Sequence, residues 1–591
     1  MSQSPTHRYL EALDNLRQLG SQFSRENPVL APELGEASAD PDVERVLEGI
    51  AYASGQIRGR LDEDLGEFVQ SYADALWPHF LRPVPSMSIV EFEAAPGVEL
   101  PEPRPIPRET TRLATTPVDG TTCSFRTGHD VLLRPVAVES AHFEDRGRRA
   151  DLEVELCLLG DVPVRALDLD SLRFYLHADY PAAASLFAWL VGGCDGISLV
   201  TTDEGGRDHR LEVRGQAGPP VRAAGVSRDE ALLPYPARSF DGYRLLQEYF
   251  AIPQRFLFVD VLGLRALEAW KTVDRFRIVF HGRQRAPQGV RVDAGTFRLH
   301  CTPVVNLFES TTDPLLLDHR DATMLLRPSG LEPSHYEVHS IERVQGLPRQ
   351  GGPRRHYAPF GGFRSDPETA GRHYQLRRKV DPDGSGMLSY LTVVTESAGS
   401  ALPEEEWLSI DAICTNARLG EALRVGDISV ATEDSPDFAV FQNLTPVSRS
   451  VRPPLGAELL GIATRHSLLQ YAPLASTDSL RTLLSLYDFH ASEDRQSARA
   501  LELLLRSVVS IESRPESRRL QVAPVRGMHT RIVLDESGFL GEGGLFVFAS
   551  VLEEVLSLAS TLNVYTRLTA VGANEREEYS WPARIANRII P

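Results

Sequence analysis

The chain has 591 residues, 24% of them charged, and a formal net charge of -19. That length is enough for several domains with large buried cores. Because the chain as a whole is acidic, its net charge does not favour binding to nucleic acid or to an anionic bilayer. The five cysteines lie far apart without a CxxC pair, which disfavours a disulfide framework or zinc knuckle and indicates a reducing compartment.

Two helices are predicted before any strand. The first covers Pro5 to Asn27 and ends at Pro28; the second runs from Asp40, as N-cap, to Trp77. At a rise of about 1.5 Å per residue the second helix would be ~57 Å long, more than a compact domain usually needs. Its apolar residues recur every three or four positions, at Val43, Leu47, Ile50, Ile57, Leu61, Leu65, Phe68, Tyr72 and Leu76.

Because the helix is longer than a compact domain usually needs, part of the stripe is predicted to meet another chain. The same helix carries many small residues that would let a second helix approach closely: Gly49, Ala51, Ala53, Ser54, Gly55 and Gly59. How much of the stripe is covered by its own chain is left open by the pattern.

After Pro85 the period changes to two, and short strands with turn residues between them follow. The apolar run Ala182 to Cys194 is too short to span a bilayer and reads as a buried helix, so we expect no direct membrane insertion. Helices return after Gly456. The expected fold is multi-domain α+β: a helical unit at 1–85, β-rich domains at 86–240 and 241–420, and an α+β domain at 421–591.

A second candidate assembly surface is the short helix predicted at Gly242 to Phe250. Its apolar side chains are Tyr243, Leu245, Leu246, Tyr249 and Phe250. The alternative is that these residues pack on the strand predicted at 256–261, and the pattern slightly favours it.

Four motifs were weighed for chemistry, and none predicts a catalytic, metal or cofactor site. The segment 381–392 resembles a calcium loop but has Thr392 where a bidentate Glu is needed, so a hairpin turn explains it. His335 and His339 lie in a predicted strand without the HExxH pattern and are expected on its polar face. The glycines at 541–544 are expected to lead the chain into a buried helix. The arginine-rich loop at 346–371 is equally consistent with a solvated loop or a clasp on an acidic partner.

Many long stretches, in order, resemble the TssF family of type VI secretion systems. They include the opening YLEAL, the long helix, IPRETTRL followed by CSFRTGHDVLLRPV, and LDLDSLRFYLHAD. The most specific is ALLPYPARSFDGYRLLQEYFAIPQRFLFVDVLGL, at 231–264; SIDAICTNARL and LDESGFLGEGGLFVFASVLEEVLSL follow. Glu109 departs from the family pattern, which typically has Gly after Ile-Pro-Arg.

The resemblance implies a non-enzymatic scaffold without cofactors, a subunit of the baseplate wedge. Its implied partners are TssG, a second TssF copy, TssK and TssE, with the sheath and the spike and tube hub nearby. The implied location is the cytoplasm, at the inner face of the cytoplasmic membrane. Two alternatives stay open: a wedge subunit of another contractile particle, such as a phage-tail-like one, and a hydrolase with an unrecognised site.

Overall fold

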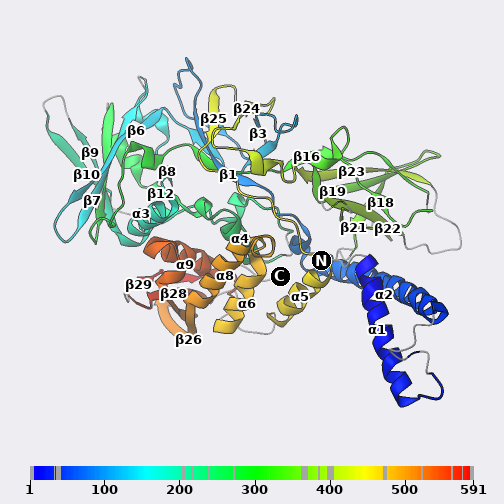
Figure 1. The fold of residues 1–591 in the computed structure, drawn as a ribbon. Helices are drawn as coiled ribbons and strands as arrows, with labels where there is room; N and C mark the ends of the chain where they lie inside the picture. Colours follow the sequence, from blue (N-terminus) through cyan, green and yellow to red (C-terminus); the bar gives the residue numbers. More distant parts are fainter. Residues whose placement is uncertain are drawn as a thin grey trace.

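The computed structural model describes residues 5–585 except 32–33, 35–40, 161, 203–205, 214–218, 237–238, 271–272, 319, 361–370, 382, 384–385, 396–404, 470–475, 521–522, 561–563 and 575–576. It consists of a large mixed body from which two helices project as an arm (Figure 1). The helices of the arm are α1 (Pro5–Glu26) and α2 (Pro41–Leu76). Their bounds agree with the sequence prediction, while Asp40, the expected N-cap, lies outside the described residues.

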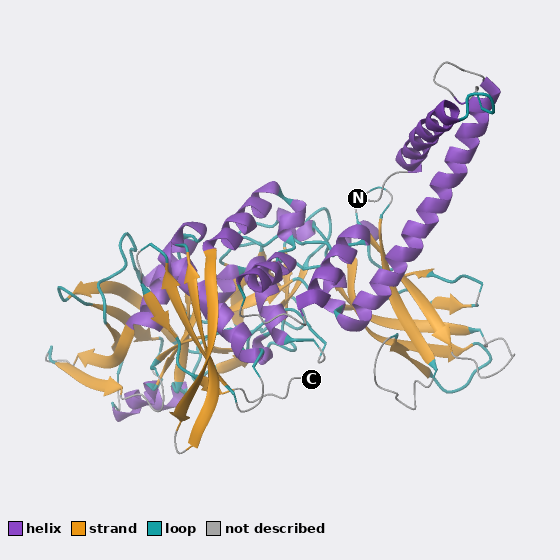
Figure 2. Cartoon of the chain, turned by 90° about the horizontal axis from the view of Figure 1, so that it is seen from below, coloured by secondary structure: helices purple, strands orange, loops and turns teal. Residues whose placement is uncertain are grey.

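Most of the arm lies clear of the body, with α1 folded back beside α2 (Figure 2). Only the C-terminal part of α2 enters the body, where it contacts α5 (Gly456–Leu469) and the strand β21 (Arg372–Val380). At Pro78 the chain turns into a short 3-10 helix, Pro78–Leu81, whose four residues are all buried. The arm is therefore rooted in the body at one end.

A six-stranded antiparallel sheet joins distant parts of the sequence. Its order is β24 (Ile428–Ala431), β3 (Arg112–Thr115), β4 (Ser124–Thr127), β15 (Cys301–Val305), β1 (Met87–Ala94) and β25 (Ala439–Asn443). These strands come from three of the four segments expected to be separate domains. Boundaries at 240 and 420 therefore do not coincide with the sheets, because strands far apart in sequence complete one another's hydrogen bonds.

Two smaller sheets lie beside it. One has the order β10 (Asp208–Val213), β9 (Cys194–Thr202), β13 (Arg275–Gly282), β7 (Ala150–Leu158) and β6 (Val136–Asp145). The other has the order β11 (Val221–Ala223), β12 (Phe258–Leu262), β8 (Ser171–Leu176) and β14 (Phe297–Arg298). A two-stranded ladder pairs β2 (Arg104–Ile106) with β5 (Val131–Leu133).

The eight-stranded sheet forms a lobe with its own core (Figure 1). It contains β16 (Phe308–Thr311), β23 (Glu406–Thr415), β19 (Glu337–Pro348), β20 (Arg355–Pro359), β21, β22 (Met387–Thr395) and β18 (Met324–Leu325), and β17 (Leu315–Leu317) also pairs with β23. Its core is separate from the largest core, which runs from the root of the arm through the helices of the body.

The helix α9 (Gly541–Leu558) is buried over most of its length and packs against α3 (Tyr180–Gly193) and α4 (Asp241–Ala251). The buried helix predicted from the apolar run at 182–194 is thus confirmed. Three further helices are α6 (Thr477–Tyr487), α7 (His490–Glu493) and α8 (Arg495–Ser507). The C-terminal sheet pairs β26 (Val508–Leu520), β27 (Ala523–Leu534), β28 (Tyr565–Gly572), β29 (Glu578–Ser580) and β30 (Arg584–Ile585), and α9 is the crossover between the parallel strands β27 and β28.

Candidate assembly surface

The first half of α2 lies against α1 through a face of small side chains. Ala51, Gly55 and Gly59 of α2 are buried there, and Leu13 is buried on α1. A Cβ atom at Gly55 would lie 3.4 Å from the backbone nitrogen of Tyr9, so the two backbones approach closely. The helix that packs on these three small residues is therefore α1 of the same chain, whereas Gly49, Ala53 and Ser54 are exposed.

The second half of α2 is held by the body on a continuation of that same face. Ala73 and Trp77 are buried, and the Trp77 ring centre lies 4.6 Å from that of His466 on α5. Gln70 is also buried, and its amide exchanges two hydrogen bonds of 3.0 Å with the backbone of Arg378 on β21. The root of the arm is thus fixed by both apolar packing and specific hydrogen bonds.

The root also contains a tyrosine hydroxyl between two histidine rings. The Tyr487 hydroxyl lies 3.1 Å from Nε2 of His79 and 3.0 Å from Nε2 of His466. A hydroxyl has one proton to donate, so one ring accepts from it while the other donates to its oxygen. Burial lowers the pKa of both histidines, that of His466 to about 4, and both rings are therefore neutral at pH 7.

The apolar stripe of α2 lies beside these contacts and is open to solvent. Its open residues are between 37% and 68% exposed, and they are Ile50, Ile57, Leu61, Leu65, Phe68, Tyr72 and Leu76. Val43 and Leu47 are half-buried. From Ile50 to Leu76 the stripe extends roughly 40 Å at 1.5 Å per residue. Large apolar side chains that remain exposed in a continuous row are typical of a surface that another chain covers.

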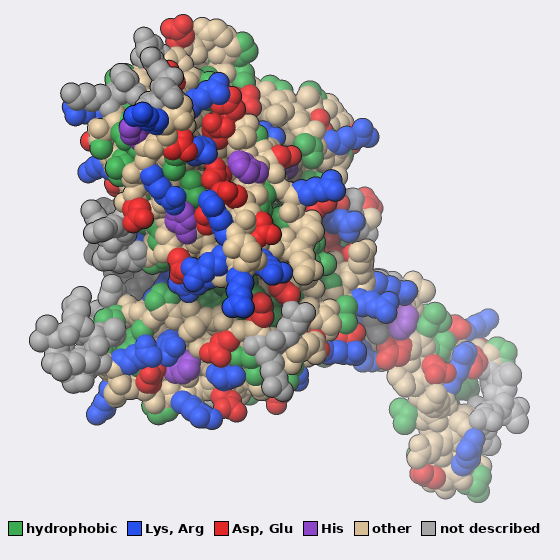
Figure 3. Space-filling model, turned by 90° about the vertical axis from the view of Figure 1, so that its left-hand side faces the viewer, with side chains coloured by type: hydrophobic (Ala, Val, Ile, Leu, Met, Phe, Trp, Pro, Cys, Tyr) green, Lys and Arg blue, Asp and Glu red, His purple; other side chains and the backbone are tan. Residues whose placement is uncertain are grey.

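The rest of the arm extends this surface. On α1 the exposed large apolar residues are Leu10, Leu19 and Phe23, and Val46 and Tyr52 of α2 are exposed as well. Hydrophobic patches lie between charged side chains on the arm where it projects from the body (Figure 3).

The second predicted surface, α4, is part of the core. Leu246 and Tyr249 are buried, and Tyr243 and Phe250 are half-buried. Tyr243 stacks on Tyr487 with ring centres 5.0 Å apart. The expectation of an assembly surface on this helix is corrected, because its apolar side chains are already covered by α6, α9 and the root of the arm.

Charged residues of α4 are buried with the apolar ones. Arg244 and Glu248 are at most 1% exposed and form an ion pair of 3.0 Å, and Arg255 pairs with the same carboxylate. The other oxygen of Glu248 accepts hydrogen bonds of 3.0 Å from the backbone nitrogens of Leu232 and Leu233. A single buried carboxylate is thus shared by two arginines, and it fixes the loop before α4.

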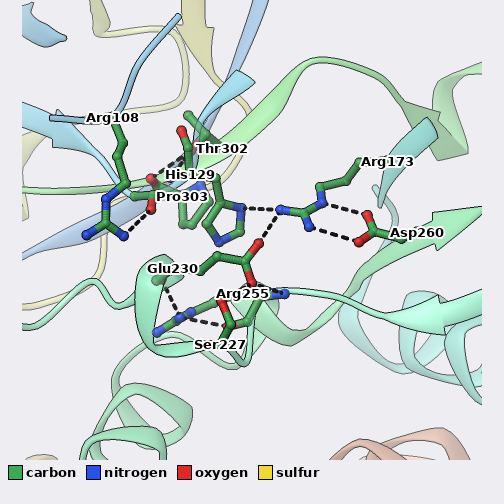
Figure 4. A network of polar contacts seen from close by, with 11 residues as sticks. Arg108, His129, Arg173, Ser227, Glu230, Arg255, Asp260, Thr302 and Pro303 are labelled. Carbon is green, nitrogen blue, oxygen red and sulfur yellow. Dashed lines mark hydrogen bonds and ion pairs between the residues drawn. The ribbon is translucent and has the colours of Figure 1, made fainter. Parts of the chain in front are cut away.

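A neighbouring network links β8, β12 and the loop after β4 (Figure 4). Arg173 binds both oxygens of Asp260, at 2.7 and 2.9 Å, and Glu230 at 2.5 Å, and it lies 3.2 Å from Nδ1 of His129. Burial alone would lower the pKa of Arg173, but the two carboxylates outweigh it and raise that pKa. Arg255 donates to the backbone oxygen of Glu230 at 2.7 Å. These ion pairs and hydrogen bonds hold β8, β12 and the loop after β4 together.

The structure shows where the loop at 381–392, the glycines at 541–544 and the two histidines lie. The Asp381 segment is the turn between β21 and β22, as a hairpin predicts, with residues 382 and 384–385 outside the described residues. Gly543 lies in the first turn of buried α9, close to the backbone of α3, in agreement with the glycine prediction. The expected polar-face position is wrong for His339, which is buried, and His335 precedes the strand.

The arginine-rich loop is partly paired within the chain. Arg349 forms a 2.5 Å ion pair with Glu405, and Arg355 pairs with Glu406, while Arg364 lies outside the described residues. In the described parts of the sequence no three His, Cys, Asp or Glu side chains are grouped so as to hold a metal ion. No helix in those parts is both long and apolar enough to cross a membrane.

Comparison with known proteins identifies the family. A family model described as "Type VI secretion system, TssF" matches residues 1–588. The type VI secretion system component TssF1 of Pseudomonas aeruginosa PAO1 is 29% identical, with 98% of each chain covered. A chain of a cryo-electron microscopy structure of the type VI secretion system TssK-TssF-TssG baseplate subcomplex is 26% identical, with a TM-score of 0.78 and coverage of 93% of this chain and 99% of that one.

A second solved structure, of the baseplate complex from the type VI secretion system, contains a chain with the same fold at 22% identity and a TM-score of 0.58, covering 99% of this chain and 100% of that one. Because the family model spans nearly the whole sequence, this chain belongs to the TssF family, components of the type VI secretion system baseplate.

Proposed function

We propose that this chain is a non-enzymatic scaffold subunit of the baseplate wedge, and that it assembles with TssG, TssK, TssE and a second copy of itself. It works in the cytoplasm, against the inner face of the cytoplasmic membrane, as part of the platform on which tube and sheath are built and from which the sheath contracts. Family membership and the name of the TssK-TssF-TssG subcomplex support TssG and TssK as partners.

The observation that carries this proposal is the open stripe on α2. Covering a leucine or phenylalanine side chain completely contributes about 1.5–3 kcal/mol relative to leaving it in water. Seven such positions in a row on a projecting arm therefore favour association with another helix strongly. We propose that TssG or the arm of a second copy lies along this stripe, in the manner of helix packing in a bundle.

The arm is suited to this role because its own contacts lie elsewhere. The face with Ala51 and Gly55 is occupied by α1, and the face with Ala73 and Trp77 is occupied by the body. Both of these faces are continuous with each other along the helix, and the stripe lies beside them. A partner can thus cover the stripe without displacing any contact of the isolated chain.

The test is co-expression of the tagged chain with its TssG, in the native sequence and in the double variant Leu61→Glu with Leu65→Glu. Both leucines are more than half exposed, so the charges should leave the isolated chain folded, as circular dichroism can verify. We expect TssG to co-purify with the native chain and to be lost from the variant.

A matched control carries the same substitutions on exposed leucines of the body, Leu468→Glu with Leu503→Glu. This control should retain TssG. The proposal is wrong if the arm variant is folded and still binds TssG and a second copy as the native chain does, or if the native chain purifies as a monomer that ignores TssG.

A further inference from the structure

A pocket of about 320 Å³ opens between the strands β3 and β4 and the loop that leads into α4. Five arginines line it: Arg108, Arg112, Arg126, Arg228 and Arg244. Three acidic residues also line it, Glu109, Asp241 and Glu309, so the formal charge of the lining is five minus three, or +2. A positive pocket is unexpected in a chain whose net charge is -19.

Two of these arginines oppose each other directly. Arg112 on β3 and Arg126 on β4 are register partners in the antiparallel ladder, and both are half-buried. Like charges at directly opposite positions of a sheet are destabilising. Burial, followed by the charges of Arg112 and Arg108, lowers the pKa of Arg126 to about 10. An anion between these guanidinium groups would relieve that repulsion.

The pairing of these arginines differs from that of the buried arginines nearby. Arg112 lies 3.4 Å from Glu309. Within the described part of the chain, the guanidinium groups of Arg108 and Arg126 have no carboxylate at ion-pair distance. They donate only to backbone oxygens, of Gly128 at 3.5 Å and of Leu232 at 3.1 Å, while the backbone nitrogen of Arg108 donates to the Asp130 carboxylate at 2.8 Å. Arg173, by contrast, is held by two carboxylates. The pocket thus retains two guanidinium charges that no acid of the described chain neutralises.

The wall opposite the strands is rigid. Glu248 holds the backbone at Leu232 and Leu233, the Arg82 guanidinium donates to the backbone oxygen of Pro234, and the Tyr235 hydroxyl donates to Gln247 at 2.5 Å. A site whose walls are fixed before binding loses little entropy when a ligand enters.

We propose that this pocket binds a carboxylate side chain from an acidic segment of a neighbouring protein subunit. The planar, forked guanidinium group matches the geometry of a carboxylate and can also bind phosphate. The three acidic side chains in the lining favour a single negative charge over a doubly charged phosphate group. That the partner is a subunit rests on the proposed function, whereas the preference for a carboxylate rests on the pocket alone.

The test uses the full chain and a peptide probe, acetyl-Gly-Glu-Leu-Glu-Gly-amide, at low salt, with the peptide containing Gln in place of both Glu as its comparison. At a concentration about five times its Kd, the Glu peptide should raise the apparent Tm by roughly 1 °C, and the Gln peptide should leave it unchanged. The substitutions Arg108→Gln and Arg126→Gln, made separately, should each weaken binding of the Glu peptide at least about fivefold.

The control Arg506→Gln, on an exposed arginine of α8, should respond as the native chain does. Arg126→Gln loses the contact with the Leu232 oxygen, so Arg108→Gln, which loses only a 3.5 Å contact, keeps the test decisive if the former fails to fold. Three results would overturn the proposal: no difference between the Glu and Gln peptides, a response that survives both substitutions, or a larger rise with inorganic phosphate than with the peptide. The arm variant Leu61→Glu with Leu65→Glu should keep the peptide response, so failure of the wedge proposal and failure of this one are distinguishable.

Discussion

The helices α2 and α4 have similar apolar spacing in the sequence and opposite environments in the structure. On α2 most of the large apolar side chains are exposed, while the small residues Ala51, Gly55, Gly59 and Ala73 are buried. On α4 nearly every residue is buried, including the charged residues Arg244 and Glu248. The helix α2 thus exposes large apolar side chains, which are normally buried, whereas α4 buries charged side chains, which are normally exposed.

The difference separates the roles of the two regions. The buried charges around α4 each have partners and hold the loops of the body in one arrangement. On the exposed stripe of α2, Tyr72 contacts Trp77 at the root of the arm, and the large apolar side chains remain between 37% and 68% exposed. Substitutions on α4 should therefore change stability, and substitutions on the stripe of α2 should change association.

The largest effect is expected for Glu248→Gln. It removes the buried carboxylate charge with which both Arg244 and Arg255 pair, which should lower the free energy of unfolding by about 3–5 kcal/mol. The control is Glu502→Gln, which breaks an exposed pair with Arg506 and should cost no more than about 0.5 kcal/mol. Urea titration of both variants measures the difference, and equal costs would contradict the buried network.

Truncation of a core leucine on α4 should come next. Leu246 is fully buried, so Leu246→Ala should cost about 2–5 kcal/mol through lost burial and the cavity that remains. Urea titration followed by tryptophan fluorescence provides the value. A cost near zero would mean that α4 is loosely packed and would reopen it as a candidate surface.

A smaller, pH-dependent effect is expected at the root of the arm. The pKa of His466 is lowered by burial from about 6.5 to about 4, so below pH 6.5 the unfolded chain binds a proton that the folded chain does not. Stability falls as the pH falls through that range, by about 1 kcal/mol at pH 5.5 for this residue.

Two buried carboxyls act in the opposite direction. Burial raises the pKa of Asp488 to about 6 and that of Glu553 to about 7, so acidification favours their folded form. The variant His466→Gln keeps these carboxyls and can still hydrogen-bond to Tyr487. Its stability should therefore fall less between pH 7.5 and 5.5 than that of the native chain, and an identical fall in both proteins would contradict the assignment.

The smallest effect on stability is expected on the stripe. Leu61 is 62% exposed, so Leu61→Ala should change the free energy of unfolding of the isolated chain by no more than about 0.5 kcal/mol. The same variant should weaken co-purification with TssG measurably. If Leu61→Ala were as destabilising as Leu246→Ala, the contrast between the two helices would not hold.

Local features of the sequence predicted the helices well. The proline at position 41, the periodic apolar residues and the proline at position 78 gave a helix from Asp40 to Trp77, and α2 runs from Pro41 to Leu76. The α+β class followed equally from the change of apolar period after Pro85. These features depend on neighbours within a few residues, and a sequence pattern contains that information directly.

Contacts between distant residues were beyond such patterns. The six-stranded sheet combines β1 with β15 and β25, whose partners lie more than 200 residues away, so domain boundaries placed along the sequence missed it. The opposed arginines Arg112 and Arg126 became a pair only through the register of β3 and β4. Apolar spacing gave this chain its helices and strands, because it depends on local geometry. Only the tertiary structure decided that α4 is covered, that small residues of α2 hold α1, and that the stripe remains open, because coverage depends on which elements meet.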